Sequence, residues 1–289
     1  MGRGLAEKTI VLRDRCRTIL EEIQPATVRA VCYRLFVEKL IPDMSKNSTA
    51  KVSRITTRAR EEGIIPWAWI VDETRELERA SQWSDPESFA DTIRAAYRRD
   101  LWEQQRRRLE VWSEKGTMRG TLRPILDHYG VGFRVMHGFG SATTMMEIAA
   151  DTKHDPVPRL ILYLGDWDPS GMHMSEVDIP ARLTEYGARV EVIRLALTTD
   201  DLQRPDLVNT LFPATDKKKD PRYRWFVETI GPKCWELDAL NPVIIRDRIE
   251  RAILAEIDIN TWEHYQAMER IELASLKDVM DGWERMRAA

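Results

Sequence analysis

The stretch RLILYLGDWDPSG, from Arg159 to Gly171, indicates both the class of fold and the place of a site. Its first six residues form a short apolar run that is typical of a buried strand. Asp166 and Asp168 follow at the carboxyl end of that strand, and residues two apart in an extended backbone point the same way. Because ligands bind beside the carboxyl ends of strands in open α/β sheets, we predict that both acids face one site.

Two interpretations of this acid pair are open. Grouped carboxylate oxygens suit a hard divalent cation such as Mg²⁺. Asp is also common at strand ends for structural reasons, since it favours turns and caps the helix that follows. Pro169, Ser170 and Gly171 are predicted to turn the chain sharply at this point.

The composition indicates a globular protein with a substantial core. The chain has 289 residues, of which 43% are hydrophobic, enough for one large domain or two ordinary ones. No apolar stretch approaches the length of a membrane span, and the first residues lack the apolar core of a signal peptide. The 3 cysteines are scattered and odd in number, which indicates reduced thiols and no structural zinc. We therefore expect a cytoplasmic protein without a membrane partner.

The charges are distributed unevenly along the chain. Residues 1–60 hold 13 Lys and Arg against 6 Asp and Glu, a net charge of +7; since the whole chain carries −3, the remainder carries −10. A basic amino-terminal segment on an acidic body favours phosphate binding at one end. A solvated helix surface would give the same asymmetry.

The basic segment is predicted to form three short helices. Apolar residues have helical spacing over residues 5–23, Thr27 is a plausible N-cap for a second helix, and Asn47 or Ser48 is one for a third. The run IIPWAWIVD (Ile64–Asp72) has the composition of a strand. Residues 1–80 are therefore predicted to be a winged-helix (helix-turn-helix) domain, which is a DNA-binding fold.

The third helix of this domain is predicted to be its basic one. Lys51, Arg54, Arg58 and Arg60 are expected on its exposed face, and we interpret Lys51, Arg54 and Arg58 as DNA-binding residues. Residues 81–108 follow as a charged helical linker. Its arginine clusters, Arg98–Arg99 and Arg106–Arg108, suit phosphates or simply water.

From Leu109 onward the pattern changes to strands alternating with helices. This alternation predicts a mostly parallel, Rossmann-like sheet with crossover helices over residues 109–289, followed by C-terminal helices. The expected strands are Leu109–Glu114, Gly132–Phe139, Arg159–Asp168 and Ala188–Leu197.

A third acid follows the first of these strands. Glu114 ends the strand that begins at Leu109, and the carboxyl ends of parallel strands lie along one edge of a sheet. Glu114, Asp166 and Asp168 are therefore expected to converge. Three neighbouring carboxylates repel one another, and a divalent cation offsets that cost, so these three residues are the predicted metal ligands.

Three segments in this order resemble a TOPRIM domain. SEKG (Ser113–Gly116), a strand that ends in HGFGS (residues 137–141), and GDWDPSG (Gly165–Gly171) resemble the motifs of that fold, which binds Mg²⁺ through a Glu and an Asp-x-Asp pair. The DPSG ending resembles that of the topoisomerase VI A subunit and the meiotic recombination initiators. CWELDAL (Cys234–Leu240) resembles a helix start in the same family.

The resemblance also points to a tyrosine in the amino-terminal helices. TVRAVCY (Thr27–Tyr33) resembles the winged-helix segment that carries the nucleophile of this family at its second Tyr, with Cys32 in place of the first Tyr. It implies that Tyr33 is the nucleophile. Arg29 lies one helical turn before Tyr33, where its guanidinium could favour the phenolate or hold the scissile phosphate. Lys115 is a further candidate for a phosphate contact.

Within this family, the chain is most similar to the topoisomerase Mini-A group. The resemblance implies cleavage of double-stranded DNA that depends on Mg²⁺, with Mn²⁺ as a substitute, through a 5′-phosphotyrosyl link that allows religation. It also implies a homodimer in which the tyrosine of one subunit works with the metal site of the other. Since the sequence has no Gly-rich nucleotide loop, any ATP-driven strand passage would need a separate ATPase subunit. Such an enzyme is expected in the nucleoid or in a phage-infected bacterial cell.

Two other functions remain open at this point. A TOPRIM nuclease would use a metal-activated water, and Tyr33 would then be a core residue. A catalytically inactive DNA-binding protein would bind DNA in a salt-dependent way without cutting it.

Overall fold

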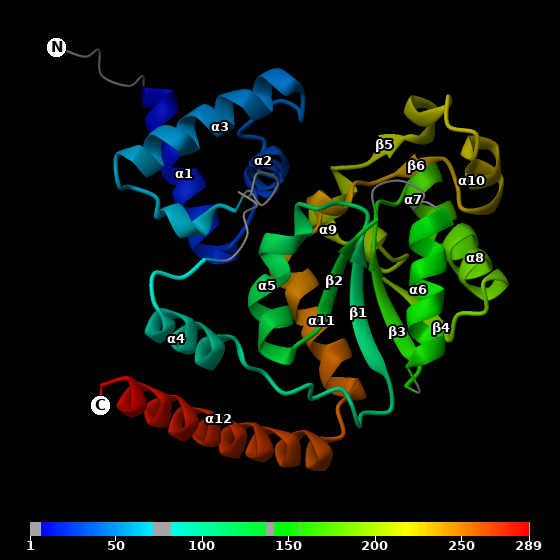
Figure 1. The fold of residues 1–289 in the computed structure, drawn as a ribbon. Coiled ribbons are helices and arrows are strands. Elements are labelled where there is room, and N and C mark those ends of the chain that lie inside the picture. The colour runs from blue at the N-terminus through cyan, green and yellow to red at the C-terminus, as the bar shows by residue number, and fades with distance from the viewer. Residues whose placement is uncertain (1–6, 72–81, 137–141, 156, 289) are drawn as a thin grey trace.

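The computed structural model describes residues 7–71, 82–136, 142–155 and 157–288, which form a helical amino-terminal part and an α/β body (Figure 1). The amino-terminal part contains α1 (Glu7–Ile23), α2 (Val28–Val37), α3 (Lys46–Glu61) and the 3-10 turn η1 (Trp67–Trp69). α4 (Pro86–Ala96) leads to the body. The body contains β1 (Arg108–Ser113), α5 (Met118–Tyr129), β2 (Gly132–Val135), α6 (Ala142–His154), β3 (Arg159–Leu164), α7 (Pro169–His173), η2 (Met174–Asp178), α8 (Ile179–Glu185), β4 (Val190–Ala196), η3 (Asp201–Gln203), α9 (Pro205–Val208), β5 (Phe212–Pro213), η4 (Ala214–Lys217), α10 (Tyr223–Thr229), β6 (Lys233–Cys234), η5 (Leu237–Ala239), α11 (Pro242–Glu256) and α12 (Ile259–Ala288).

The α/β fold with a parallel sheet is confirmed. The strands lie in the order β2-β1-β3-β4, and every neighbouring pair is parallel. The antiparallel pair β5-β6 forms a separate small ribbon. Since β1 and β3 are neighbours, the residues that follow them emerge side by side at the carboxyl edge of the sheet.

Alternation along the strands gives the sheet two apolar faces. Val111 and Leu162 pack with the buried side chains of α5 and α11 on one face. Trp112 and Tyr163 pack with those of α6 and α8 on the other. The body therefore has three layers, with helices on both sides of the sheet (Figure 1).

The amino-terminal helices have an apolar core of their own. Leu12, Ile19, Val31 and Val52 belong to a cluster distinct from those of the body. The Thr27 hydroxyl accepts a hydrogen bond from the backbone of Ala30 and caps α2, as the sequence predicts.

The prediction of a strand over Ile64–Asp72 is wrong for residues 64–71, the part of this range that the structure describes. Residues 64–71 instead contain η1, and Ile70 forms only an isolated bridge with Ala26. Pro66 stands at the start of η1, and a proline lacks the N–H that a strand ladder needs. Asp72 lies outside the described residues. The helices are present, but the wing of a winged helix is not confirmed.

Two details of α3 also differ from expectation. Ser45, rather than Asn47 or Ser48, caps α3. Arg60 is half-buried over the ring of Trp67 instead of sharing the exposed basic face. Lys51, Arg54 and Arg58 are exposed along one side of the helix, as predicted.

The linker is less helical than predicted. α4 ends at Ala96, residues 97–100 have no regular structure, and residues 101–107 form turns and bends before β1. The arginines of this stretch have partners within the chain: Arg99 pairs with Glu272 of α12, and Arg108 lies 2.5 Å from both Asp100 and Asp155. These ion pairs fix the extended path, so Arg99 and Arg108 do not form a free phosphate-binding surface.

Two further expectations concern the body. β2 ends at Val135, and residues 137–141, where the longer strand and the HGFGS segment were expected, lie outside the described residues. Cys234–Leu240 is not a helix start, because it contains the end of β6 and then η5, and α11 begins only at Pro242.

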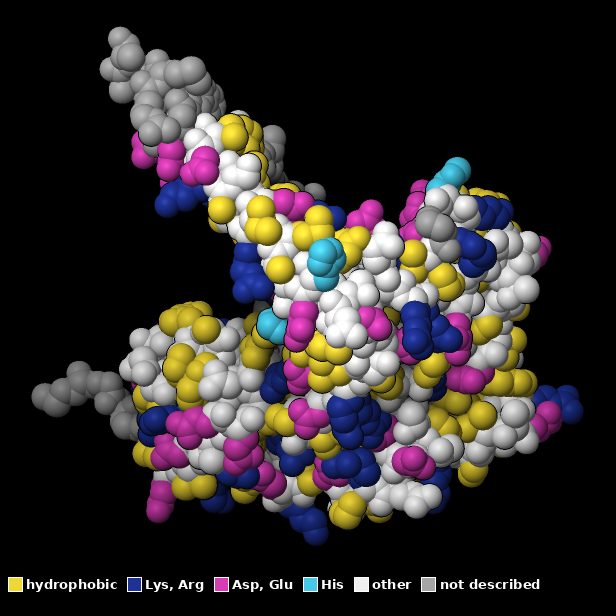
Figure 2. Space-filling model, turned by 90° about the horizontal axis from the view of Figure 1, so that it is seen from below, with side chains coloured by type: hydrophobic (Ala, Val, Ile, Leu, Met, Phe, Trp, Pro, Cys, Tyr) yellow, Lys and Arg dark blue, Asp and Glu magenta, His cyan; other side chains and the backbone are white. Residues whose placement is uncertain are grey.

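The last helix, α12, lies along α4 and projects from the body (Figures 1 and 2). The face seen in Figure 2 carries basic and acidic side chains intermingled rather than one extended patch of either sign. No helix of the described residues is both long enough and apolar enough to cross a membrane.

The buried cysteines give a test of this fold. Burial raises the pKa of the Cys16 and Cys234 thiols to about 12 and that of Cys32 to about 11. We expect all three to react slowly with a thiol reagent at pH 8 and quickly after unfolding, as followed by absorbance. Because the unfolded chain loses these protons near the ordinary pKa of 9.0 and the folded chain keeps them, the free energy of unfolding should fall as the pH rises above about 9. A fast-reacting thiol in the folded protein would contradict this packing.

Candidate functional site

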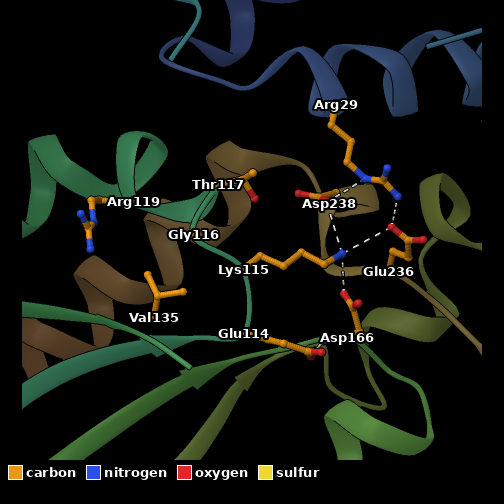
Figure 3. Close-up of a pocket in the computed structure, with 10 residues that line it drawn as sticks. All are labelled: Arg29, Glu114, Lys115, Gly116, Thr117, Arg119, Val135, Asp166, Glu236 and Asp238. Atoms are coloured by element: carbon orange, nitrogen blue, oxygen red, sulfur yellow. Dashed lines mark hydrogen bonds and ion pairs between the residues drawn. The ribbon is translucent and has the colours of Figure 1, made fainter. Parts of the chain in front are cut away.

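A cleft of about 590 Å³ opens at the carboxyl edge of the sheet, between the body and α2 (Figure 3). Glu114 and Lys115 enter it from the end of β1, Asp166 from the end of β3, and Arg29 from α2. The remaining lining residues are Gly116, Thr117, Arg119, Val135, Glu236 and Asp238.

The predicted convergence of the two strand ends is observed. A Glu114 carboxylate oxygen accepts a hydrogen bond of 3.4 Å from the backbone N–H of Asp166. Burial, followed by the negative charges of Asp166 and Asp168, raises the pKa of Glu114 to about 7. Among the residues that the structure describes, no basic group lies within ion-pair distance of Glu114.

Asp166 is held by a basic side chain and by the backbone. Its Oδ1 lies 2.9 Å from the Lys115 ammonium and accepts a 2.7 Å hydrogen bond from the backbone N–H of Leu237. Burial outweighs these stabilising contacts and raises the pKa of Asp166. Asp166 therefore sits in a strongly negative, poorly solvated position.

Asp168 caps a helix, which is the structural role that the sequence analysis offered as the alternative to metal binding. Its Oδ1 accepts a 2.8 Å hydrogen bond from the backbone N–H of Gly171, and so it caps α7. Its Oδ2 lies 3.1 Å from the Lys217 ammonium. Both interpretations remain compatible with this geometry, since a capping carboxylate keeps a second oxygen for another cation.

A second acid pair, which the sequence analysis did not assign, lines the same cleft. The backbones of Trp167 and Trp235 exchange hydrogen bonds of 2.8 and 2.9 Å, and this bridge places Glu236 and Asp238 beside Asp166. The Glu-x-Asp spacing within CWELDAL repeats the one-residue separation of Asp166 and Asp168. That spacing was the available signal, but the sequence predicted no strand before it, whereas the structure has the two-residue strand β6 there.

Lys115 lies at the centre of these acids. Its ammonium is 2.9 Å from Asp166, 3.4 Å from Glu236 and 3.2 Å from Asp238 (Figure 3). Burial alone would lower the pKa of Lys115, but the surrounding carboxylates outweigh it and raise the pKa. The residue predicted to contact phosphate is thus already paired.

Arg29 connects α2 to the same acids. Its guanidinium forms an ion pair with Glu236 and lies 3.0 Å from Asp238, whose side chain is 1% exposed. It also lies 5.5 Å from the centre of the Tyr33 ring. The spacing predicted from the sequence, one helical turn between Arg29 and Tyr33, therefore brings both residues to the cleft side of α2.

Tyr33 is buried at this boundary. It is 5% exposed, and it packs in the same core cluster as Trp167 and Leu237 of the body. Burial, followed by the charge of Glu236, raises the pKa of Tyr33 above its ordinary value, against the opposing effect of Arg29 and Lys115. A phenol in this position is a poor nucleophile until a phosphate or a rearrangement changes its surroundings.

The carboxylates of the cleft have the residue types that a divalent cation needs, but not yet the arrangement. Carboxylates are the right ligands for Mg²⁺. Burial, and then the charges of two neighbouring carboxylates, raise the pKa of Glu114, and Asp238 Oδ1 is buried without a hydrogen-bond partner. Among the described residues, however, no three His, Cys, Asp or Glu side chains are already arranged to hold an ion. The residue types fit Mg²⁺, and Lys115 and Lys217 would have to release oxygens of Asp166 and Asp168.

The predicted DNA-binding residues of α3 lie elsewhere. Lys51, Arg54 and Arg58 line a smaller hollow of about 250 Å³ with Arg13 of α1. Arg58 also pairs with Glu62 at 2.7 Å. This surface shares no lining residue with the acidic cleft.

Comparisons of the chain with models of protein families, with curated proteins and with solved structures found no match. The function therefore has to be inferred from the cleft and from the motifs.

Gly171 gives a test of how tightly the cleft is built. A Cβ at this position would collide with the backbone oxygen of Asp166 and lie 3.0 Å from a Glu114 carboxylate oxygen. We expect Gly171→Ala to lower the free energy of unfolding by about 1–3 kcal/mol, as overpacking usually does. Denaturant titration measures the change.

Gly132→Ala is the matched control. A Cβ there would meet only Glu110 Cγ, at an ordinary 3.6 Å. Equal stability of the two variants would contradict the close approach of Gly171 to the two strand ends.

Proposed function

We propose that this protein is a Mg²⁺-dependent DNA-cleaving enzyme of the topoisomerase VI A type, in which Tyr33 attacks the phosphodiester. The observation that carries the proposal is the meeting, in one cleft, of Arg29 from α2 with acids from the ends of two neighbouring strands, with the buried ring of Tyr33 centred 5.5 Å from the Arg29 guanidinium. A phenol, a guanidinium, an ammonium and several carboxylates are the groups that transesterification of DNA requires.

Each side chain has a chemical task in this proposal. The Tyr33 hydroxyl gives up its proton to water, and its oxygen forms a bond to phosphorus. The bond from phosphorus to the 3′ oxygen of the neighbouring nucleotide breaks, and that oxygen takes a proton from water. The product is a 5′-phosphotyrosyl link, which religation reverses. Arg29 and Lys115 supply positive charge to the phosphate, and the planar guanidinium of Arg29 suits two phosphate oxygens at once.

Glu114, Asp166 and Asp168 would hold the cation. When bound, Mg²⁺ or Mn²⁺ would supply charge stabilisation at the phosphodiester oxygens. The acids of this site also repel a phosphate, so an unloaded cleft is a poor site for DNA. Release of Lys115 from Asp166 would free both the carboxylate for the cation and the ammonium for the phosphate.

The proposed partner is double-stranded DNA, bound to α3 by Lys51, Arg54 and Arg58. A homodimer is proposed because two sites are needed to cut two strands. A separate ATPase subunit would be needed for strand passage. The nucleoid, or a phage-infected bacterial cell, is the proposed place of action.

Hydrolysis by a metal-activated water is the second candidate. The burial of Tyr33 favours it, since a phenol that is 5% exposed and packs in the core cluster of the body has the features of a core residue. Glu114, Asp166 and Asp168 would then hold the cation, and no protein–DNA link would form.

Covalent capture separates the two candidates. The protein is incubated with end-labelled DNA and Mg²⁺ and then denatured, and we expect a protein–DNA adduct that is absent for Tyr33→Phe. The phenyl ring fills the same space but has no oxygen to form the ester. Cleavage without an adduct, unchanged in Tyr33→Phe, would instead support hydrolysis.

Tyr129→Phe is the matched control for this substitution. The Tyr129 hydroxyl lies outside this cleft, where it donates a 3.0 Å hydrogen bond to the Glu250 carboxylate. It should form the adduct as the unchanged protein does.

The proposed DNA surface has its own test. We expect Arg54→Ala to weaken binding of unrelated DNA sequences alike and to reduce the slope of log K against log salt by about 1, as loss of one phosphate contact does. Fluorescence anisotropy over a salt series measures both quantities. Lys277→Ala, an exposed change on α12, is the control, and equal slopes for both variants would contradict this surface.

A further inference from the structure

A second basic segment lies on the body. Residues 216–224, with the sequence DKKKDPRYR, carry three Lys and two Arg against two Asp, a net charge of +3. They interrupt residues 61–289, whose total charge is −10. We call residues 216–224 the basic turn. None of them lines the acidic cleft or the hollow beside α3.

The fold anchors the basic turn beside the proposed metal ligands at both of its ends. Before the turn, β5 pairs with β6, and β6 leads directly to Trp235, whose backbone bridges Trp167 next to Asp168. After the turn, α10 packs on α7, the helix that Asp168 caps. The rings of Trp225 and His173 meet edge to face there, with their centres 5.1 Å apart. Figure 1 shows α10 beside α7 at the carboxyl edge of the sheet.

Internal hydrogen bonds give the basic turn a defined shape. The backbone N–H groups of Lys218 and Asp220 donate to the backbone oxygens of Thr215 and Lys217, at 3.2 and 2.8 Å. The Asp220 carboxylate accepts a 2.8 Å hydrogen bond from the backbone N–H of Arg222 and lies 3.3 Å from its guanidinium. The turn is therefore held by its own backbone as well as by its two ends.

The cations of the basic turn are accessible to an anionic partner. Lys218 and Lys219 are exposed, and among the described residues neither forms an ion pair. The Arg224 side chain is 87% exposed and pairs with Glu228 one helical turn away. An ion pair this exposed contributes little free energy, so a phosphate can replace the carboxylate at small cost.

Lys217 connects the basic turn to the acids. Its ammonium lies 3.1 Å from Asp168 Oδ2, the oxygen that is left after Oδ1 caps α7. The Asp168 side chain is 4% exposed, whereas that of Lys217 is 42% exposed. Lys217 thus has room to turn outward, while Asp168 is enclosed. A cation held by Asp168 would take the place of this ammonium and leave Lys217 without its carboxylate.

We propose that the basic turn is a second DNA-backbone surface, which binds phosphates beside the acids and which Lys217 joins when a cation takes Asp168. The inference rests on the proposed function and adds a contact on the body to the one on α3. Lys and Arg neutralise phosphates and release counterions, so the turn adds affinity without sequence preference. Because Asp168 and DNA share Lys217, the cation and DNA each strengthen the binding of the other.

Removal of the two unpaired lysines tests the surface. We expect Lys218→Ala combined with Lys219→Ala to weaken binding of unrelated duplexes alike and to reduce the slope of log K against log salt by about 2. Arg270→Ala combined with Lys277→Ala removes the same charge from exposed positions of α12 and is the matched control. Fluorescence anisotropy over a salt series measures both variants. Equal slopes for the two would overturn the surface.

The link between Lys217 and the cation is tested without DNA. Lys217→Met keeps most of the length of the side chain and loses its charge. We expect it to bind Mn²⁺ about 5-fold more tightly than the unchanged protein, since no ammonium then competes for Asp168. Lys218→Met, whose ammonium forms no ion pair, should bind Mn²⁺ as the unchanged protein does. Isothermal titration calorimetry measures the affinities, and equal values for Lys217→Met and the unchanged protein would overturn the link.

The coupling is measured by DNA affinity with and without Mn²⁺ at constant ionic strength, on a duplex that a denaturing gel shows to be intact. Mn²⁺ should strengthen DNA binding of the unchanged protein, and the gain should be about 5-fold smaller for Lys217→Met. Equal gains would overturn the role of Lys217. These readouts do not depend on cleavage. Absence of a covalent adduct from the unchanged protein would refute the proposed function itself, which is a separate result.

Discussion

The ammonium of Lys115 holds together parts of the chain that are far apart in sequence. Buried carboxylates cost free energy unless a cation or hydrogen-bond donors face them. Lys115, from the end of β1, meets Asp166 from the end of β3 and both Glu236 and Asp238 from the η5 segment. Arg29 extends the same network to α2. Breaking this network would leave several buried acids without a partner.

Among the described residues, Glu114 is the cleft carboxylate that forms no ion pair, and its position gives the cleft its chemistry. The carboxylates of Asp166, Asp168, Glu236 and Asp238 pair with Arg29, Lys115 and Lys217, while Arg119 also lines the cleft and Arg194 donates to the backbone oxygen of Asp166. Glu114 has the weakest compensation, and burial beside Asp166 and Asp168 raises its pKa to about 7. A divalent cation would remove the excess negative charge and let the basic groups turn to a phosphate.

The sequence predicted the features that depend on local patterns. An apolar run followed by Gly165 and Asp166 predicted β3, and the alternation of strands with helices predicted β1. The rule that parallel strands end at one edge then brought Glu114 close to Asp166. Glu236 and Asp238 were missed because their place depends on the Trp167–Trp235 bridge, a contact between residues distant in sequence. The strand expected to start at Ile64 was mispredicted because β-branched and aromatic composition says little about whether a partner strand is present.

A crystal soaked in Mn²⁺ and measured at the manganese absorption edge tests the central claim most directly. The account predicts an anomalous peak between the Glu114 carboxylate and those of Asp166 and Asp168, with the Lys115 ammonium displaced from Asp166. Mn²⁺ bound only elsewhere, with Lys115 still paired to Asp166, would contradict it.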